Sequence, residues 1–200
     1  MSDKRVPTQK RSIEKRNKII EKGFKLICEK GYYNVTTADI AKYAEVSTGI
    51  VYQYFDDKKD IFLEGIKNYS DSIMYPMIDV LNETKIDLKD IDILLKKLID
   101  KFVEKHTMSK KSHEELIAMS HIDEDVFNLL KTSEMEMANK LEFALKSNGI
   151  NLENMKEKVH IIYGLTENFC HEIVYHKHPS IDYDVMQKEV IDIIKYILSK

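Results

Sequence analysis

The sequence is short of the residues that interrupt helices and of those that crosslink a chain. Its 200 residues include three prolines, six glycines, two cysteines and no tryptophan. Glycine and proline are the costliest residues in a helix interior, so their scarcity beside many Lys, Glu, Ile and Leu predicts an all-α chain. We expect Cys28 and Cys170 to be reduced, buried thiols, with a disulfide or a redox switch as the alternative.

Long apolar runs are also missing. No run approaches the ~18 residues that a membrane-spanning helix needs, and the polar, basic N-terminus has no apolar signal-peptide core. A hydrophobic content of 43% is ordinary for a protein that buries a core. We therefore expect a cytoplasmic protein with no membrane partner and, by length, one or two domains.

The chain has no overall basic excess, but its charge is unevenly distributed. The formal net charge is −3, whereas residues 1–30 hold ten Lys and Arg against four acids. Such a run is usually a solvated face. Here it directly precedes the two-helix motif described below, which favours contact with phosphates.

Hydrophobic spacing predicts about nine helices after a flexible basic arm over residues 1–10. The fourth helix must end or kink at Tyr75-Pro76, because proline lacks the N–H that a helix interior needs. A weaker stretch over 77–81 is a candidate for one more short helix. The nine predicted helices cover residues 12–30, 37–44, 47–54, 57–75, 88–102, 112–119, 123–147, 152–176 and 182–198.

Capping residues mark several of these helix ends. Gly31 is expected to stop the first helix. Thr36 offers a hydroxyl as N-cap of the second, with Asp39 three residues on as a capping-box partner. Ser47 is expected to cap the third helix in the same way. Asn148-Gly149 is expected to end the helix over 123–147.

The most informative stretch is residues 36–55, which predicts two short helices joined by a tight turn. The second helix carries hydroxyls and aromatic rings at its exposed start, with Val51 and Phe55 behind them. A helix that enters the major groove of DNA is built in this way. The alternative, a plain helical core segment, does not explain why caps, turn, aromatics and a basic lead-in coincide.

Residues 11–65 resemble the DNA-binding domain of the tetracycline-repressor (TetR) family of bacterial transcriptional regulators. The resemblance covers about a quarter of the chain, and the motif is long and composite. The remaining three quarters match the family only in helix count, acidity and apolar character. The matching residues are Gly31, Tyr32, Thr36, Ile40, Ala41, Ala44, Val46, Ser47, Gly49, Tyr52, Tyr54, Phe55 and Lys58.

The resemblance implies an N-terminal three-helix helix-turn-helix DNA-binding domain over 11–56 and a helical bundle over 57–200 for ligand binding and dimerisation. It further implies a homodimeric repressor that a small-molecule effector, partly apolar, releases from a palindromic operator in double-stranded DNA. We expect no enzyme activity and no cofactor. The alternatives are an enzyme with an appended helical domain and a non-specific architectural DNA-binding protein. The sequence contains no phosphate-binding loop and no nucleophile elbow, which argues against the enzyme. The overall acidity of the chain argues against the architectural protein.

The family pattern also assigns DNA-contact roles around the two short helices. Helix N-termini bind anions, which agrees with phosphate contacts at their starts. The resemblance implies that Thr36 and Thr37 contact one phosphate and Lys58 another. Ser47, Thr48 and Gly49 would begin the recognition helix. Tyr52 would contact the DNA backbone or a base methyl group, and Gln53 and Tyr54 would contact the DNA backbone.

Four residues depart from the family pattern. Ala38 stands where many relatives have a base-reading Arg, Thr48 where Lys or Arg is frequent, and Ile50 where Thr is frequent. With fewer long donors, base readout is expected to depend on thymine methyl groups and DNA shape. Glu45 replaces the usual glycine of the turn, and a left-handed backbone there would be strained.

The predicted effector pocket and dimer interface lie in the region 57–200. Methionine and aromatic side chains suit an adaptable apolar site, and plain core packing is the alternative for each of them. The dimer is expected to use the last two long helices, and a close helix approach would explain Gly164 in mid-helix. Pocket candidates are Tyr69, Met77, Phe102, Met119, Phe127, Met135, Tyr163, Thr166 and Phe169; interface candidates are Gly164, Ile173, Val190, Ile194 and Ile197.

All seven histidines follow residue 105, but we expect no metal site. His171 and His176 are five residues apart, which places them about 140° apart around a helix rather than on one face. Zinc-binding helices instead place histidines four residues apart. A metal at the helix end near His176 and His178, or a role in pH sensing, is the weaker alternative.

Overall fold

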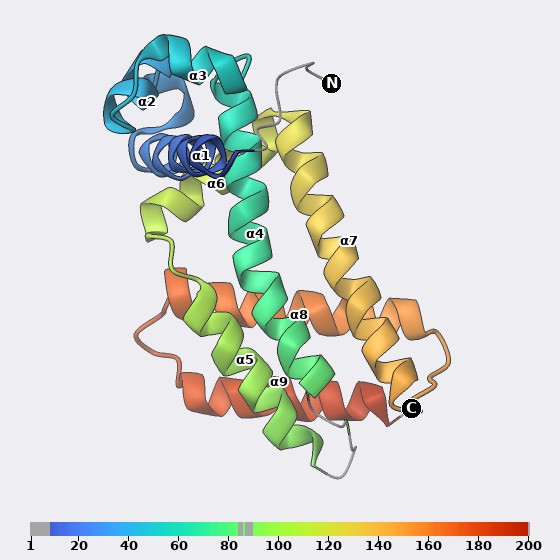
Figure 1. Cartoon of the computed structure of the whole chain (residues 1–200). Helices are drawn as coiled ribbons and strands as arrows, with labels where there is room; N and C mark the ends of the chain where they lie inside the picture. The colour runs from blue at the N-terminus through green and yellow to red at the C-terminus, as the bar shows by residue number, and fades with distance from the viewer. Residues whose placement is uncertain (1–8, 84–85, 87–89, 200) are drawn as a thin grey trace. The chain divides into compact units, whose positions relative to one another are not determined.

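The computed structural model of the chain describes residues 9–83, 86 and 90–199. These residues form nine α-helices and one 3₁₀ turn, with no β-strand among them (Figure 1). The all-α prediction is therefore confirmed. Residues 1–8 of the predicted arm, and Leu88 at the start of one predicted helix, lie outside the described residues.

Most helix bounds agree with the predicted ones to within three residues. The exception is the fourth helix, which is longer than expected. The helices are α1 Lys10–Lys30, α2 Thr37–Tyr43, α3 Thr48–Tyr54, α4 Lys58–Glu83, α5 Ile91–Lys105, α6 Lys110–Ile122, α7 Glu124–Ser147, α8 Met155–Tyr175 and α9 Tyr183–Leu198, with the 3₁₀ turn η1 at Tyr32–Asn34.

Of the two outcomes expected at Tyr75-Pro76, an end or a kink, the end does not occur, and the candidate short helix over 77–81 is part of the same helix. α4 is one helix of 26 residues with Pro76 inside it. Proline removes one backbone donor from a helix interior. Apolar residues on the last turns, Met77, Val80 and Leu81, are 3%, 7% and 4% exposed, and their burial favours continued helix beyond the proline.

The chain divides into two compact units. The first unit holds the residues up to Ser70 together with Ser109–Lys131, and the second holds Asp71–Met108 and Thr132–Lys200. The units therefore do not follow the predicted boundary at residues 56 and 57. The difference arises because the start of α4 packs on α1, and because α6, remote in sequence, also packs on α1.

The core of the first unit is built on a close junction at Gly23 of α1. Ile19, Ile20 and Ile27 of the same helix are at most 2% exposed. A Cβ built on Gly23 would lie 2.6 Å from Ile61 Cγ2 of α4 and 3.0 Å from Ile40 Cγ2 of α2. Glycine therefore allows α1 to approach α2 and α4 simultaneously.

A second close approach lies one residue further along α1. A Cβ on Gly65 of α4 would overlap the Phe24 side chain. The Phe24 ring lies 5.8 Å from the ring of Phe62, centroid to centroid. The start of α4 thus packs closely against α1 at two successive residues of α1, Gly23 and Phe24.

Ion pairs and hydrogen bonds bring α6 and the start of α7 into the same unit. Lys59 Nζ of α4 lies 2.8 Å from Asp123 Oδ2 and 2.6 Å from Asp125 Oδ2. These two carboxylates raise the pKa of Lys59, and Lys59 lowers that of Asp123. Glu115 of α6 accepts a hydrogen bond from the backbone N–H of Tyr32 at 2.6 Å.

The second unit is a helical bundle with an extensive apolar core. α8 packs along α9, and α5 packs on both (Figure 1). Ile99 of α5, Phe169 of α8 and Ile194 of α9 are at most 1% exposed. Among the helices of the described chain, none is long and apolar enough to cross a membrane.

Replacing Gly23 by alanine should destabilise the first unit. The added methyl group requires Ile61 and Ile40 to move, and overpacking of this kind costs about 1–3 kcal/mol. Urea unfolding followed by circular dichroism measures the change. Asn17→Ala, at an exposed position of the same helix, is the matched control and should change stability by less than about 0.5 kcal/mol. Equal stability of the two variants would contradict the close junction.

Candidate nucleic-acid interface

A complete capping box fixes the start of α2, as predicted. Thr36 Oγ1 accepts from the Asp39 backbone N–H at 3.2 Å, and Asp39 Oδ2 accepts from the Thr36 backbone N–H at 2.9 Å. The Thr36 hydroxyl and then its backbone N–H are the main causes that lower the pKa of the Asp39 carboxyl. Two N–H groups at this helix end are thereby satisfied, and the helix start is held near the surface.

The turn between α2 and α3 places a non-glycine residue in a left-handed conformation. Glu45 has φ 57°, and Val46 N–H donates to Ala41 O at 2.9 Å across the turn. Glu45 also accepts from Lys18 Nζ of α1 at 2.6 Å. The strain expected if the backbone is left-handed is therefore present, and the contact with α1 stabilises the same turn.

α3 exposes one of its two tyrosines and buries the other. Val51 and Phe55 are at most 1% exposed, as predicted for the residues behind the recognition surface. Tyr52 is 48% exposed, whereas Tyr54 is only 7% exposed and belongs to the core. The burial of Tyr54 argues against the DNA-backbone contact assigned to it.

The start of α3 also differs from expectation. Ser47 is the N-cap residue by position, with extended backbone, but its side chain makes no capping hydrogen bond. The predicted side-chain cap is therefore wrong, although the backbone carbonyl of Ser47 accepts hydrogen bonds from the N–H groups of Ile50 and Val51, as at an N-cap. Ser47, Gly49 and Gln53 are all exposed.

Lys58, predicted to bind a phosphate, makes two contacts within the protein. Its Nζ donates to Tyr32 O at 2.6 Å and to Val35 O at 2.8 Å, and lies 4.3 Å from the Tyr32 ring centroid. Burial is the main cause that lowers its pKa, and the charge of Asp57 opposes the shift. An ammonium has three donors, so one remains for a ligand.

These elements surround a shallow hollow of about 520 Å³ on the first unit. Five of the nine predicted DNA-contact residues line it: Thr36, Thr37, Thr48, Tyr52 and Lys58. The other lining residues are Tyr32, Tyr33, Val35, Ala38 and Asp57.

Sequence reasoning missed Tyr33, which is 69% exposed at this hollow. In the same segment, Val35 is buried at 1% exposed. Tyr33 instead packs edge-on against the Tyr32 ring, with centroids 5.4 Å apart. The pair of adjacent tyrosines directly after a helix stop was the available signal.

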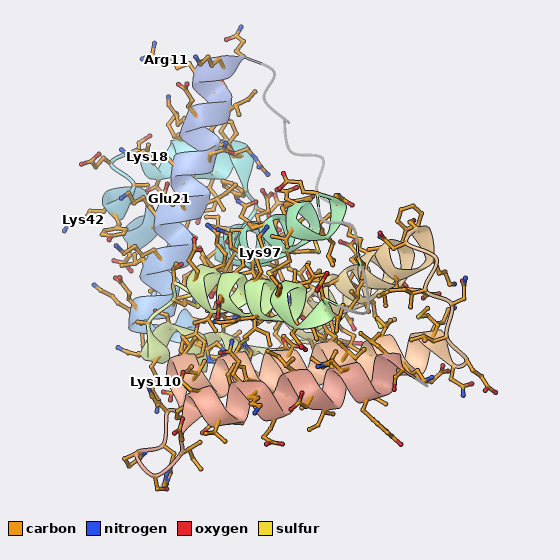
Figure 2. The ribbon with its side chains drawn as sticks, turned by 90° about the horizontal axis from the view of Figure 1, so that it is seen from below. Arg11, Lys18, Glu21, Lys42, Lys97 and Lys110 are labelled. Atoms are coloured by element: carbon orange, nitrogen blue, oxygen red, sulfur yellow. The ribbon has the colours of Figure 1, made fainter. Side chains whose placement is uncertain are left out.

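Basic residues lie on the outside of the same unit. Figure 2 shows Arg11 on α1 and Lys42 on α2 with their side chains directed away from the helices, and both are exposed. Two other basic residues of α1 serve the fold, since Arg16 pairs with Glu64 and Lys18 with Glu45. The basic N-terminal run therefore contributes both structure and exposed positive charge.

The predicted pocket residues separate into three groups. Met77, Phe102, Tyr163 and Thr166 line an apolar cavity of about 70 Å³ within the second unit. Phe169 is buried in that unit's core, and Met135 is exposed. Tyr69, Met119 and Phe127 belong to the first unit, so they do not line this cavity.

The predicted interface residues also divide by exposure. Gly164 is exposed, and a Cβ there would meet nothing within 4 Å. Ile173 and Ile197 are half-buried against the core. Val190 and Ile194 are 4% and 0% exposed, so they serve the core of the protomer rather than a surface.

The remaining candidates for chemistry are few. Cys28 and Cys170 are buried and unpaired, and burial raises the pKa of the Cys28 thiol to about 12. Within the described ranges, no group of three or more His, Cys, Asp or Glu side chains is arranged to hold a metal ion.

Two short helices joined by a tight turn, with an exposed second helix start, define a helix-turn-helix protein. Residues 19–64 match the model of the bacterial regulatory proteins of the tetR family. Over these residues the chain is similar to the tetR family of bacterial regulatory proteins, and the curated relatives that it matches are transcriptional regulators.

Two curated relatives are similar to part of the chain. The transcriptional regulator HbdR of Aromatoleum sp. (strain CIB) is 46% identical over 72 residues, which are 36% of this chain and 31% of HbdR. IcaR of Staphylococcus aureus, a negative transcriptional regulator of the biofilm operon icaADBC, is 38% identical over 52 residues, 26% of this chain and 28% of IcaR. The chain thus spans less than a third of the length of each of these relatives.

Solved structures share the fold over almost the whole chain. A protein of Mesorhizobium loti assigned to the TetR family has a TM-score of 0.74 and 18% identity, over 96% of this chain and 98% of that one. A transcriptional regulator of Saccharomonospora viridis, solved in complex with choline, has a TM-score of 0.68 and 17% identity, over 92% and 97% of the two chains.

Replacing Thr36 by valine should destabilise the first unit while keeping the shape of the side chain. The change removes the oxygen that caps α2, at a cost of about 1 kcal/mol. Thermal unfolding measures the loss. Thr37→Val is the control, because the box does not use the Thr37 hydroxyl, and its stability should stay close to that of the parent chain. Two variants of equal stability would contradict the role of the box.

Proposed function

We propose that this chain is a DNA-binding transcriptional regulator that acts in the bacterial cytoplasm. The observation that carries the proposal is the hollow on the first unit, which Thr36, Thr37 and Thr48 line together with Tyr52 and Lys58. Hydroxyls, helix N-termini and a lysine are the groups that hold a DNA backbone in register.

The recognition surface would read DNA with α3 in the major groove. Tyr52 and Gln53 are exposed on α3, and Gly49 leaves space for a close approach at its start. Phosphate contacts would come from the starts of α2 and α3 and from the third donor of Lys58. Ser47 and Thr48 complete the proposed set, while the buried Tyr54 would act by supporting α3 from behind.

We propose a homodimer formed through α8 and α9. Both helices keep apolar side chains exposed: Ile161 on α8 is 56% exposed, and Ile193 and Tyr196 on α9 are 47% and 64% exposed. Large exposed apolar residues on long helices are typical of surfaces that a partner covers. A two-fold dimer presents two recognition helices to the halves of a palindrome, about 34–36 Å apart.

Effector control would reside in the second unit. Its apolar cavity offers a small-molecule site, and the structural relative from Saccharomonospora viridis holds choline. The action would be repression, as in the negative regulator IcaR, with release when the effector shifts the population away from the DNA-competent state.

Binding to DNA is tested by capturing fragments of the host genome with the purified protein and measuring affinity for the enriched fragment against random DNA of equal length. The proposal predicts tighter binding to the enriched fragment and affinity that falls steeply with salt. Equal affinity for random DNA would support an architectural protein, and no binding to either would contradict the proposal.

Replacing Gln53 by glutamate should weaken binding to the captured fragment by roughly tenfold or more, because a carboxylate on the exposed face of α3 would repel the DNA phosphates. The side chain keeps its size, and thermal stability should not change. Asn68→Asp, an equivalent change at an exposed position of α4, is the control. Fluorescence anisotropy measures both variants, and equal affinities would show that this face of α3 is not at the DNA.

Replacing Gly164 by leucine should dissociate the proposed dimer while leaving the protomer folded. The site is open in the protomer, and leucine is a better helix former than glycine by about 0.8 kcal/mol. Sedimentation velocity measures the oligomeric state, and circular dichroism measures the helix content. An unchanged dimer in the leucine variant would exclude this part of α8 from the interface.

A further inference from the structure

We infer that the cavity in the second unit binds an uncharged, unbranched alkyl chain. The inference rests on the proposed effector function and names the chemical class of that effector. Three features of the cavity carry it: the residue types of its walls, the hydrogen bonds that its hydroxyl groups already make, and its volume.

The walls of the cavity are almost entirely hydrocarbon. Helices α4, α5, α7, α8 and α9 all contribute to them, and fifteen of the eighteen described lining residues are Met, Leu, Ile or Phe. Met77, Ile99 and Ile194 are among the most buried of these, at 3%, 1% and 0% exposed. Such walls remove the apolar surface of a ligand from water and offer it no hydrogen bond. They therefore favour a ligand whose buried part is itself hydrocarbon.

The polar side chains among the described lining residues all come from α8. They are Tyr163, Thr166 and Glu167, and each is only partly buried. Both hydroxyl hydrogens are used within that helix: Thr166 Oγ1 donates to Ile162 O at 2.9 Å, and Tyr163 Oη donates to Glu167 Oε1 at 3.4 Å. A hydroxyl has a single hydrogen to donate. A carboxylate or carbonyl of a ligand could therefore take a hydrogen bond from either hydroxyl only by breaking one that the protein makes.

The same walls discriminate against a charged ligand. A carboxylate or ammonium placed among hydrocarbon side chains loses its hydration, and burying a charge costs far more than burying a neutral group. An alkyl chain loses no hydrogen bond when it enters and gains by leaving water. An uncharged chain is therefore favoured over an ionised one of the same length. Because the described lining includes the carboxylate of Glu167, the test below includes an ammonium probe as well as an anionic one.

The volume of the cavity restricts the shape of the ligand. It is about 70 Å³, roughly half of the ~150 Å³ of an engineered apolar cavity that holds benzene. A ring is therefore too wide for it, whereas an unbranched chain can enter by its end. Met77 and Met137 line the cavity, and flexible methionine side chains can yield to an entering chain.

The test compares four probes with six carbons each: 1-hexanol, cyclohexanol, hexanoate and n-hexylammonium. Isothermal titration calorimetry on the full chain gives their affinities. The inference predicts that 1-hexanol binds at least about tenfold more tightly than each of the other three, a difference of about 1.4 kcal/mol. A smaller margin over either ion would overturn the uncharged class, and a smaller margin over cyclohexanol would overturn the unbranched shape. A failure of all four to bind would overturn the inference as a whole.

Two matched variants of α7 locate the bound chain. Met137→Ala widens the cavity at a partly buried position, so the preference for 1-hexanol over cyclohexanol should fall by about tenfold. Met135→Ala makes the same change two residues away, at a side chain that is 44% exposed and does not line the cavity, and should leave the preference unchanged. Because the measurement is a ratio of two affinities in one variant, a modest loss of stability does not affect it. Equal ratios in the two variants would place 1-hexanol outside the cavity and overturn the inference.

A release assay separates this inference from the proposed function. The complex of the protein with the captured DNA fragment is titrated with each probe. Release by hexanoate or hexylammonium and not by 1-hexanol would leave the effector-controlled regulator standing and overturn the ligand class. If 1-hexanol instead binds in the cavity, as the Met137→Ala ratio reports, without changing DNA affinity, the ligand class is supported and effector control is contradicted.

Discussion

The close contact of three helices at Gly23 is the constraint on which the recognition surface depends. α1 reaches Ile40 of α2 and Ile61 of α4 there because a hydrogen takes the place of a side chain. α2 has seven residues and α3 has seven, too few to be stable alone. Their positions must therefore come from packing on α1 and α4. The contact at Gly23 sets the distance of α2 from α1.

The segment between α1 and α2 receives its position from both sides. Lys58 of α4 donates to the carbonyls of Tyr32 and Val35, and Glu115 of α6 accepts from the Tyr32 N–H. This segment leads directly into the capped start of α2, where a phosphate is proposed to bind. Any displacement of α4 or α6 would therefore alter the donors offered to DNA. The same lysine supports the surface and supplies one of its donors.

Local signals in the sequence predicted the first unit well. The capping box at Thr36 and the glycine stop at Gly31 depend on neighbouring residues alone, so both could be anticipated. Long-range packing decided what was missed. The fourth helix continues through Pro76 because apolar side chains after the proline are buried. Tyr54 is buried by residues that are distant in the sequence. In the second unit, apolar spacing marked Val190 and Ile194 without telling a core face from a partner face, because both faces carry the same residue types.

Amide hydrogen exchange of the full chain, with and without the captured DNA fragment, tests the central claim most directly. The account predicts that DNA slows exchange at the starts of α2 and α3, over residues 36–39 and 47–53. Exchange in α5 and in the core of the second unit should change little. Protection confined to α8 and α9, or no protection at the two helix starts, would contradict a recognition surface built on the junction at Gly23.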